Sequence, residues 1–484
     1  MAVLSDGAST LPVKVEDPFL VGFNPSFDVE NPKDWPTSRK WAVTDVLSAT
    51  GFNRIMVSTI MAPALTTIAY ELHMNSAESV IALSIYLLAT AFGPLVIGPL
   101  SEVYGRKKVL HASNVWFLIW NIVCGFANTK EVLIAARFLA GFGASSIYAL
   151  AGGVLTDVWR PEQRGRSLST YLLIPLLGAA VGPIIGGFMA FRTTWRWMFW
   201  STSIFQAVMI VVSFTVFRET YAPTILARRV AELRKDTGNA RYYTEHERLL
   251  ANRSVLSIIW EALSRPLRLL MFHPIIQIDT VISAFDYGVL YIVLASFANL
   301  WVKQYGTSVE MSGLHYIAIA LGEIAGSQLG APIMDHYYRT MQTRHPDGEL
   351  GPEHRIPLTL PGAIIGPLGL FMYGWAAQYH LHWAVVDLGI FIACFGMQTR
   401  GMAMQAYVMD AYVHHTSSAM AATQLFRSLA AFLFPLFTPV MYAKMGYGWG
   451  NSALAFAGLA LGLPASLALW YFGPMLRKRM PSSV

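Results

Sequence analysis

The sequence has little charge and almost no cysteine. Charged residues make up 13% of its 484 residues, against roughly 25% in an average soluble protein, and hydrophobic residues reach 54%. So little charge cannot cover a globule in water, and so many apolar residues exclude a disordered chain. Cys124 and Cys394 lie in separate apolar runs, which excludes a disulfide framework and a metal knuckle. An integral membrane protein is the class that remains.

Signatures of ATP binding and of hydrolytic catalysis are absent as well. Without a G-x-x-x-x-G-K-[ST] loop there is no phosphate cradle, so ATP is not the expected energy source. H-E-x-x-H and G-x-S-x-G motifs are missing too, so we expect no enzyme, no catalytic residue, no metal and no cofactor. Basic residues fall in short clusters between apolar runs, which argues against a nucleic-acid partner. An ion gradient is therefore the expected driving force.

Apolar stretches near the roughly 20 residues that cross a bilayer as a helix recur along the chain. Twelve spans are predicted, at 42–65, 80–100, 109–128, 132–156, 168–190, 197–217, 273–300, 313–334, 357–377, 383–409, 417–442 and 452–474. Segment 218–272 is too polar to span and divides them into halves, an arrangement in which transporters bind cargo between the halves. We expect an all-α integral membrane fold with six-helix bundles at 42–217 and 273–474, a linker at 218–272, and tails at 1–41 and 475–484.

Positive charge sets the expected orientation. Most of the 35 Lys and Arg residues fall in the tails, the linker and the loops on the same side as both termini. Because Lys and Arg accumulate in cytoplasmic loops, both termini are assigned to the cytosol. Residues 1–40 lack an apolar h-region, so no cleavable signal peptide is expected. The predicted location is the plasma membrane, with the vacuolar membrane as the alternative.

A compact pattern of glycine and charge follows the second predicted span. It comprises Gly98, Glu102, Gly105, Arg106, Lys107 and Lys108. The pattern predicts a tight turn whose charges clamp a neighbouring helix and contribute to gating; a plain basic cytoplasmic loop is the alternative. It resembles the cytoplasmic signature loop of the major facilitator superfamily.

Spans 4 and 5 carry further signals. Arg137 lies inside span 4, where a guanidinium is costly unless it faces a partner or a cavity; a snorkelling arginine is the alternative. Span 5 contains Gly178, Gly182, Pro183, Gly186 and Gly187. Glycines spaced by four residues share one helix face and permit close helix approach, and the proline bends the axis. The first segment resembles the superfamily's span-4 motif, whose arginine is associated with proton coupling, and the second resembles the motif of its antiporter branches.

Other patterns are similar to those of the fungal twelve-span drug:proton antiporters and extend the resemblance over nearly the whole chain. They are Asn31-Pro-Lys-Asp-Trp35-Pro, Trp195-Arg-Trp197-Met-Phe199-Trp, Pro352-Glu-His-Arg355, Asp410-Ala-Tyr and Leu425-Phe-Arg427-Ser-Leu. The resemblance implies the superfamily fold and a monomer in the lipid bilayer, with protons and a small-molecule substrate as its partners. It implies multidrug, polyamine or secondary-metabolite export without identifying the substrate.

Ionisable residues inside the spans are the expected carriers of the mechanism, because each costs about 2.5 to 3.5 kcal/mol at a helix centre unless it is paired or hydrated. Counting residues places Arg54 of span 1 and Asp286 of span 7 at similar depth. The resemblance implies that spans 1 and 7 are equivalent helices that line the cavity, so we expect the two residues to face one another across it. We expect Asp286 or Glu323 to carry the proton, with Arg54 and Arg137 as coupling candidates. The alternative is that Arg54 and Asp286 form a permanent salt bridge.

The remaining intramembrane charges are interpreted as structural. Asp279 and Arg400 both fall in the cytosolic third of their spans and could pair. Asp410 and Arg427 are interpreted as architectural, with Arg427 satisfied by backbone or by a carboxylate. Aromatic residues that could stack on a planar or cationic ligand are Tyr86, Tyr148, Phe285, Tyr287 and Tyr291.

The expected function is proton-coupled efflux of a drug, toxin or secondary metabolite by alternating access. The alternative is a proton-coupled importer of a nutrient or of an organic cation such as a polyamine, against which the span-5 motif argues. A membrane-embedded transferase is disfavoured because no reactive cluster is present.

Overall fold

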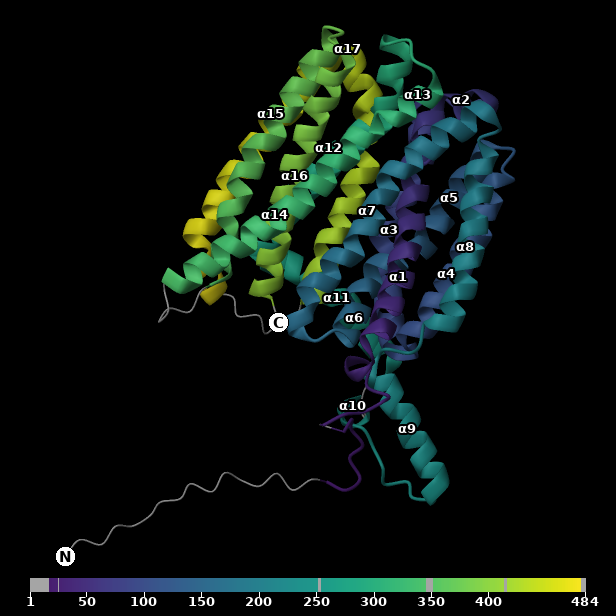
Figure 1. The fold of residues 1–484 in the computed structure, drawn as a ribbon, viewed down its shortest axis with the longest axis vertical. Helices are drawn as coiled ribbons and strands as arrows, with labels where there is room; N and C mark the ends of the chain where they lie inside the picture. Colours follow the sequence, from purple (N-terminus) through teal and green to yellow (C-terminus); the bar gives the residue numbers. More distant parts are fainter. Residues whose placement is uncertain (1–16, 25, 251–253, 345–350, 413–415, 480–484) are drawn as a thin grey trace, which may run out of the picture.

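A computed structural model of the chain describes residues 17–24, 26–250, 254–344, 351–412 and 416–479, which form an almost entirely helical molecule (Figure 1). No strand occurs in these ranges, although an isolated parallel bridge joins Leu20 to Tyr243. The helices before the linker are α1 (Thr37–Thr59), α2 (Leu65–Glu71), α3 (Ser76–Tyr104), α4 (Arg106–Gly125), α5 (Lys130–Ala144), α6 (Ser146–Val158), α7 (Pro161–Arg192) and α8 (Arg196–Val216). The linker carries α9 (Ala222–Thr237), α10 (Glu245–Leu250) and α11 (Val255–Phe272). After it come α12 (Pro274–Asn299), α13 (Val309–Leu314), α14 (Tyr316–Arg344), α15 (Thr359–Gln378), α16 (Trp383–Ala411) and α17 (Thr416–Arg479).

Helices lie at all twelve predicted spans, but several spans are not a single helix. Span 1 continues beyond α1 into a short 3-10 helix, Ala62–Ala64, and span 8 begins in α13 and continues in α14. Span 4 is divided at Ser145 into α5 and α6. Spans 11 and 12 together form α17, which changes direction at Gly446, where φ is 69° and ψ is 177°. A positive φ of this size favours glycine, which is the residue that the sequence has at this change of direction.

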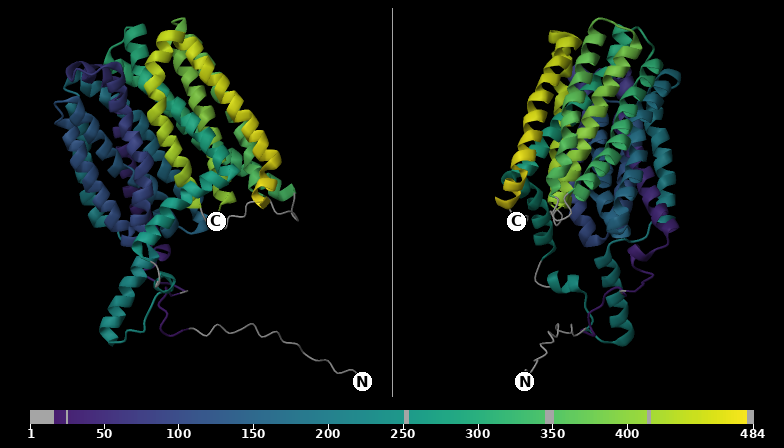
Figure 2. Two further views of the ribbon diagram at one scale, coloured as in Figure 1. Left: turned by 180° about the vertical axis from the view of Figure 1, so that it is seen from behind. Right: turned by 60° about the vertical axis from the view of Figure 1, so that its left-hand side comes forward.

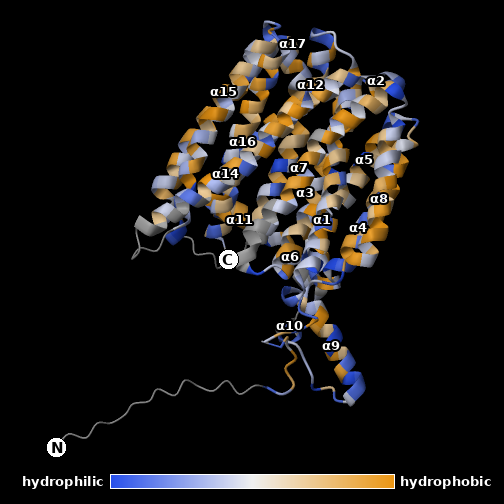
Figure 3. Ribbon diagram, viewed as in Figure 1, coloured by the Kyte–Doolittle hydropathy of each residue, from blue (hydrophilic) through white to orange (hydrophobic). Residues whose placement is uncertain are grey.

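Eight segments of the described chain are long and apolar enough to cross a membrane, and the last, Ser418–Lys478, contains both helices of α17. Helices α1, α4 and α16 are more polar because they bury side chains such as Arg54, Asn114 and Arg400 among their neighbours. Figure 3 shows apolar residues along the helices above the linker and many hydrophilic residues around α9 and α10. These three helices therefore each carry buried polar side chains, although α4 also has exposed apolar residues such as Trp116 and Ile119.

The helices before and after the linker, called here the first and second groups, share a core at only one end of the molecule. At the end far from the termini, the shared core includes Val57, Phe117 and Trp195 of the first group and Val289, Trp301 and Tyr373 of the second. At the other end each group has its own core, one including Leu110 and Val158 and the other Tyr407 and Leu469. The groups accordingly diverge toward this end in the left view of Figure 2. The groups are thus joined at the far end and separated at the end that carries the termini.

Candidate functional site

The turn between α3 and α4 is held by two acidic residues outside the predicted pattern. Glu219, which follows α8, accepts hydrogen bonds from the backbone N–H groups of Arg106 (2.9 Å) and Lys107 (3.2 Å) and so caps α4. The Arg106 guanidinium lies 3.6 Å from the Asp157 carboxylate at the end of α6. Glu102, expected to supply a clamping charge, is exposed and forms no ion pair within the described chain. The clamp onto a neighbouring helix is present, but its acids are Asp157 and Glu219.

The glycines and lysines of this turn differ in their surroundings. Gly105 has φ +92°, and a Cβ atom there would meet the Glu219 carboxyl group, so glycine leaves room for the capping residue. No atom lies within 4 Å of the corresponding position at Gly98. Lys107 is half-buried and Lys108 is exposed.

The glycine face of α7 lies against α1. A Cβ atom at Gly178 would come within 2.5 Å of the Phe52 carbonyl oxygen, and one at Gly182 within 2.6 Å of the Thr59 hydroxyl oxygen. A Cβ atom at Gly186 would also meet the backbone just after α1. Glycine at these three positions is what allows the two helices to approach so closely.

The end of α7 contacts the second group through α13. A Cβ atom at Gly187 would lie 2.9 Å from the Val309 carbonyl oxygen, and one at Gly313 would lie 2.8 Å from the Pro183 carbonyl oxygen. Arg192 and Glu310 add an ion pair of 3.3 Å between the same helices. This contact, called here the α7–α13 seal, lies at the end where the two groups share a core.

Arg54 is buried in the first group and does not face Asp286. Its guanidinium donates hydrogen bonds to the carbonyl oxygens of Gly143 and Ala144, both at 3.2 Å, and to the side chains of Ser146 and Asn114. The predicted pairing was wrong because residue counting gives the depth of a side chain but not its direction around the helix axis. The break between α5 and α6 places carbonyl acceptors within reach of Arg54.

Arg137 is equally enclosed. It donates to the carbonyl oxygens of Val57 (2.9 Å), Ala82 (3.3 Å) and Leu83 (3.2 Å), and its guanidinium lies 4.6 Å from the centre of the Tyr86 ring. Tyr86, a candidate for substrate contact, is only 2% exposed. Both residues are therefore enclosed by the first group, and Tyr86 belongs to the core that this group shares with the second.

Asp286 instead forms an ion pair with Arg400 of α16, in which Nε lies 3.0 Å from Oδ2 and Nη2 bonds Oδ1. The predicted pairing of Arg400 with Asp279 was also wrong. Asp279 accepts hydrogen bonds from the hydroxyl groups of Thr423 (2.7 Å) and Ser283 (3.3 Å). The two acids are seven residues apart and so lie on one face of α12, where Arg400 reaches the second.

Arg427 lies where α17 meets the first group. The next residue, Ser428, is joined to Thr90 of α3 by a hydrogen bond of 3.1 Å between their hydroxyl oxygens. The Arg427 guanidinium is 4.5 Å from the centre of the Tyr287 ring, and the residue is half-buried. A backbone or carboxylate partner was expected, but Arg427 donates no hydrogen bond to any described residue. Within the described ranges, this guanidinium therefore packs against an aromatic face and forms no hydrogen bond.

Glu323 of α14 is a half-buried carboxylate with neither a hydrogen bond nor an ion pair among the described residues. Arg427 interacts with it electrostatically, and also with Tyr148 of α6, without forming an ion pair. Arg427, Tyr287, Tyr148 and Glu323, called here the central site, come from α17, α12, α6 and α14. All four are half-buried, so each keeps part of its surface accessible.

The other aromatic candidates flank the central site. Tyr291 is buried with its ring 5.2 Å from that of Tyr287. Phe285 packs within the second group, with its ring 6.2 Å from that of Phe434. Of the five aromatic candidates, Tyr148 and Tyr287 are thus the ones at the central site.

A histidine cluster at the end far from the termini carried no sequence signal. His315, next to α13, places Nδ1 2.7 Å from the Asp387 carboxylate and stacks on Trp301, with ring centres 3.6 Å apart. The three residues come from separate segments, so no motif joins them. No group of three or more His, Cys, Asp and Glu side chains in the described ranges could hold a metal ion.

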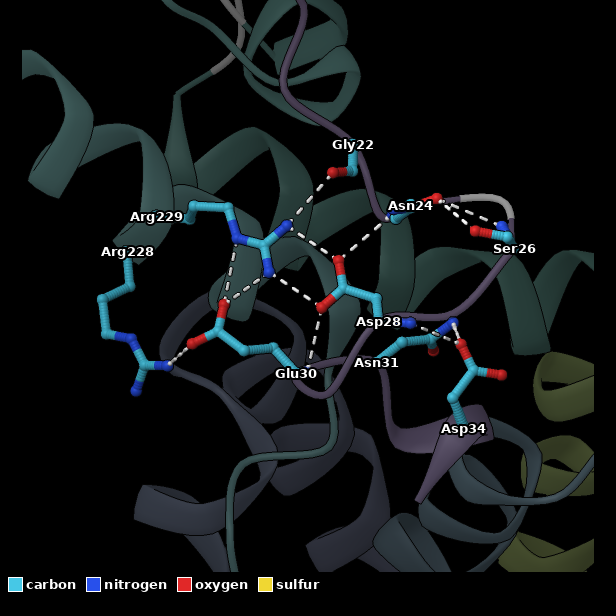
Figure 4. A network of polar contacts seen from close by, with 9 residues as sticks. All are labelled: Gly22, Asn24, Ser26, Asp28, Glu30, Asn31, Asp34, Arg228 and Arg229. Carbon is cyan, nitrogen blue, oxygen red and sulfur yellow. Dashed lines mark hydrogen bonds and ion pairs between the residues drawn. The ribbon is translucent and has the colours of Figure 1, made fainter. Parts of the chain in front are cut away.

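Ion pairs are numerous at the end that carries the termini. Asp410 pairs with Arg355. Ahead of α1, Asp28 accepts hydrogen bonds at 2.9 Å from both Nη atoms of Arg229 in α9, and Glu30 binds the same guanidinium (Figure 4). The Arg229 guanidinium lowers the pKa of the Asp28 carboxyl to about 2. The contacts of Asp28 and Glu30 with Arg229 tie the N-terminal segment to the linker.

Comparisons with known proteins agree with this architecture. The family described as Major Facilitator Superfamily matches residues 47–435. The chain is 55% identical over 424 residues to the probable efflux pump mfs2 of Aspergillus flavus, covering 88% of this chain and 100% of that protein. It is 40% identical over 462 residues to the efflux pump vrtL of Penicillium aethiopicum, covering 95% and 91%. A partially occluded, inward-open structure of the xylose transporter XylE from E. coli matches with a TM-score of 0.64 over 90% of this chain and 98% of that chain, at 18% identity.

Proposed function

This chain belongs to the major facilitator superfamily, and on that premise we propose that it exports a small organic molecule in exchange for protons. The relatives named as efflux pumps support export. We further propose that it works as a monomer in the plasma membrane, with 42–217 and 273–474 as its two moving bundles. In this proposal the linker 218–272 and the tails 1–41 and 475–484 are cytosolic.

The observation that carries proton coupling is the isolation of Glu323. An ionised carboxylate in the middle of a span is costly unless it is paired or hydrated. Glu323 has no hydrogen-bond partner in the described chain, keeps part of its surface accessible, and lies within the electrostatic reach of Arg427. Such a group can bind a proton on one side of the membrane and release it on the other, because its surroundings differ between the two states.

The other predicted coupling candidates are less suited to this role. Asp286 is held by Arg400, and breaking a buried ion pair leaves an uncompensated charge. Arg54 and Arg137 are surrounded by acceptors within the first group. We assign them to holding the bundles together, and we assign the proton to Glu323.

The unequal ends of the molecule support alternating access. With both termini in the cytosol, the structure corresponds to a state closed to the outside by the shared core and the α7–α13 seal. Opening to the outside requires this seal to separate while the two cytosolic cores come together. Proton binding at Glu323 from the outside then accompanies release of the cargo.

The test is dye export from yeast cells that express the chain, with and without a protonophore, using the fluorescent compounds Nile red and 7-aminocoumarin as probes. A proton-driven exporter leaves the cells with more dye when the gradient collapses, whereas an importer leaves them with less. In Glu323→Gln we expect the protonophore-sensitive part to fall by about fivefold or more, since coupling free energies are typically about 1–3 kcal/mol.

Glu131→Gln is the matched control, because Glu131 is an exposed carboxylate near the start of α5. It should export dye like the unmodified protein at equal surface expression. If Glu323→Gln keeps full protonophore sensitivity, the assignment of the proton to Glu323 is wrong. If the unmodified protein exports neither dye against its gradient, the proposal of proton-driven export fails for both probes.

A further inference from the structure

Building on the proposed function, we infer that the cargo of the central site is an uncharged planar molecule that carries both a hydrogen-bond donor and a carbonyl oxygen. In this arrangement the donor, an O–H or N–H group, binds the Glu323 carboxylate. The carbonyl oxygen accepts from Arg427, and the ring of the cargo lies against the tyrosines.

Arg427 offers the donor half of this arrangement. A guanidinium has several N–H donors in one plane, and a buried one normally finds acceptors for them. Arg427 donates to no described residue and packs against the face of Tyr287. Arg54 and Arg137 have acceptors supplied by the protein, at three or more positions each. Of these three guanidinium groups, Arg427 is the one that donates no hydrogen bond to a described residue, so its donors can bind an acceptor on a ligand.

Glu323 offers the acceptor half. Its carboxylate accepts no hydrogen bond in the described chain, and its residue keeps accessible surface. The other acids near Arg427 are already engaged, Asp286 by Arg400 and Asp279 by the Thr423 and Ser283 hydroxyl groups. Glu323 is therefore the acid near Arg427 that is open to a ligand.

A positive and a negative charge at one site, those of Arg427 and Glu323, select against a charged cargo. A cation attracted to Glu323 meets the positive field of Arg427, and an anion attracted to Arg427 meets the negative field of ionised Glu323. Asp286 and Asp279 also interact electrostatically with Arg427, but Asp286 is paired with Arg400 and Asp279 accepts hydrogen bonds from two hydroxyl groups. Two further neighbours are neutral side chains, Tyr148 toward Arg427 and Cys394 toward Glu323. A neutral molecule with its own donor and acceptor satisfies both groups at once.

Exchange for a proton selects against an anion. Hydrogen bonds to an ionised carboxylate are roughly twice as strong as those between neutral groups, so a donor on the cargo binds less tightly once Glu323 is protonated. Proton binding therefore weakens cargo binding, as an exchanger requires. An anion would bind more tightly after Glu323 is protonated, which would carry proton and cargo in the same direction. Exchange of a neutral molecule for a proton also carries positive charge inward.

The aromatic residues account for the planar shape. Tyr287 stacks on Arg427 from α12, and Tyr148 comes from α6 of the other group. A flat ring beside the guanidinium can contact tyrosines from both groups, because aromatic faces stack on one another and on guanidinium planes. An aliphatic cargo would lack these contacts.

The test is direct binding to the purified full chain in lipid nanodiscs at pH 8, measured by equilibrium dialysis against empty nanodiscs. The probes have two fused rings. They are 7-aminocoumarin, neutral with an N–H donor and a carbonyl oxygen; 7-methylcoumarin, without the donor; coumarin-3-carboxylate, an anion; and 1-methylquinolinium, a cation. We expect 7-aminocoumarin to bind about tenfold more tightly than each of the other three, the size expected for one hydrogen bond to a charged group.

Variants assign this preference to its two ends. In Glu323→Gln the advantage of 7-aminocoumarin over 7-methylcoumarin should disappear, while in Arg427→Gln both coumarins should weaken together. Arg427→Lys keeps the charge but loses the planar stack, and should weaken both by less than Arg427→Gln. Glu131→Gln should leave all four affinities unchanged.

A higher affinity for the anion or the cation than for 7-aminocoumarin would overturn the inference. So would equal binding of the two coumarins by the unmodified protein, a measurement that does not depend on any variant folding. The binding test uses no proton gradient, so its outcome is independent of the export test. If the cells export dye in a proton-driven way but the probes bind in another order of affinity, this inference is wrong and the proposed function stands. If the probes bind in the expected order but no proton-driven export occurs, the proposed function is wrong instead.

Discussion

The charges buried in the two groups of helices are arranged in opposite ways. In the first group, Arg54 and Arg137 are surrounded by acceptors, most of them backbone carbonyl oxygens. In the second group, Asp286 has a single charged partner, while Glu323 and Arg427 have no hydrogen-bond partner in the described chain. A guanidinium bound to fixed carbonyls has no alternative partner, so the first group is built to keep its arrangement. Charges without fixed partners can respond to a proton or a ligand, which is why we propose that the proton and the cargo bind at Glu323 and Arg427 of the second group.

The position of the helix break explains why the first group can enclose Arg54. Carbonyl groups of an intact helix are already bonded within it, whereas those beside a break are available to other donors. Gly143 and Ala144 lie at the junction of α5 and α6 and supply two of the four acceptors of Arg54. The same guanidinium therefore joins α1, α4 and the α5–α6 junction, which makes it a structural centre of the first group.

The variant with the largest expected effect on stability removes Arg54, which is enclosed in the first group. Arg54→Leu leaves buried acceptors without donors, at about 1–3 kcal/mol for each unsatisfied group, so we expect a loss of roughly 4 kcal/mol or more. The measurement is the thermal unfolding of the purified protein in detergent. Arg427→Gln is the matched variant and should unfold near the temperature of the unmodified protein. Equal destabilisation by the two variants would remove the distinction between the groups.

The ion pair between Asp286 and Arg400 tests whether the second group also contains fixed charges. Asp286→Asn or Arg400→Gln alone should cost about 3–5 kcal/mol, because each leaves a buried charge without its partner. The double variant should be more stable than the sum of the single losses predicts. Thermal unfolding of all four proteins gives the coupling energy of the pair. A coupling near zero would show that the pair is not held in solution, and Asp286 would rejoin Glu323 as a candidate for the proton.

The α7–α13 seal links the comparison to motion between the groups. Gly313→Ala places a Cβ atom 2.8 Å from the Pro183 carbonyl oxygen, and overpacking of this kind costs about 1–3 kcal/mol, so the sealed state should become less populated. The measurement uses a cysteine in place of Ile184, which lies next to Gly313. If the sealed state is less populated, a membrane-impermeant maleimide should label this cysteine about fivefold faster or more. Cys124 and Cys394 are buried and give little background.

Gly152→Ala is the control for the seal, because no atom lies within 4 Å of the added Cβ position. It should leave the labelling rate of the cysteine at position 184 unchanged. Unchanged labelling in Gly313→Ala as well would mean that the α7–α13 contact does not limit opening at this end.

The sequence predicts the helices well because their signal is local. Runs of apolar residues locate all twelve spans, and glycines spaced by four residues identify the packing face of α7. The more polar helices α1, α4 and α16 are still found because polar residues remain a minority within them. Helix breaks are less visible, and the division at Ser145 carries no proline or strong cap to announce it.

The partners of the buried charges could not be predicted in the same way. Residue counting gave the depth of Arg54 and Asp286, but their partners depend on which way each side chain points and on how neighbouring helices are rotated. Glu219 and His315 were missed for a related reason, since their partners lie in distant segments. Arg427 and Glu323 were identified as buried charges, yet only the packing reveals that the protein leaves their hydrogen-bonding groups open.

The smallest expected effect concerns the attachment of the N-terminal segment to α9. The pKa of Asp28 is lowered from near 4 to about 2 by Arg229, so its contribution to stability is present above pH 4 and is lost as the pH falls from about 4 to 2. The contribution is at most about 2 kcal/mol. Pepsin, which is active in this range, should therefore cleave the segment before α1 increasingly fast as the pH falls. In Asp28→Asn cleavage should already be fast at pH 4 and should change little below it, because the titrating carboxylate is gone. A pH profile shared by both proteins would mean that the ion pair with Arg229 does not hold the segment, and that the linker is bound by its other contacts.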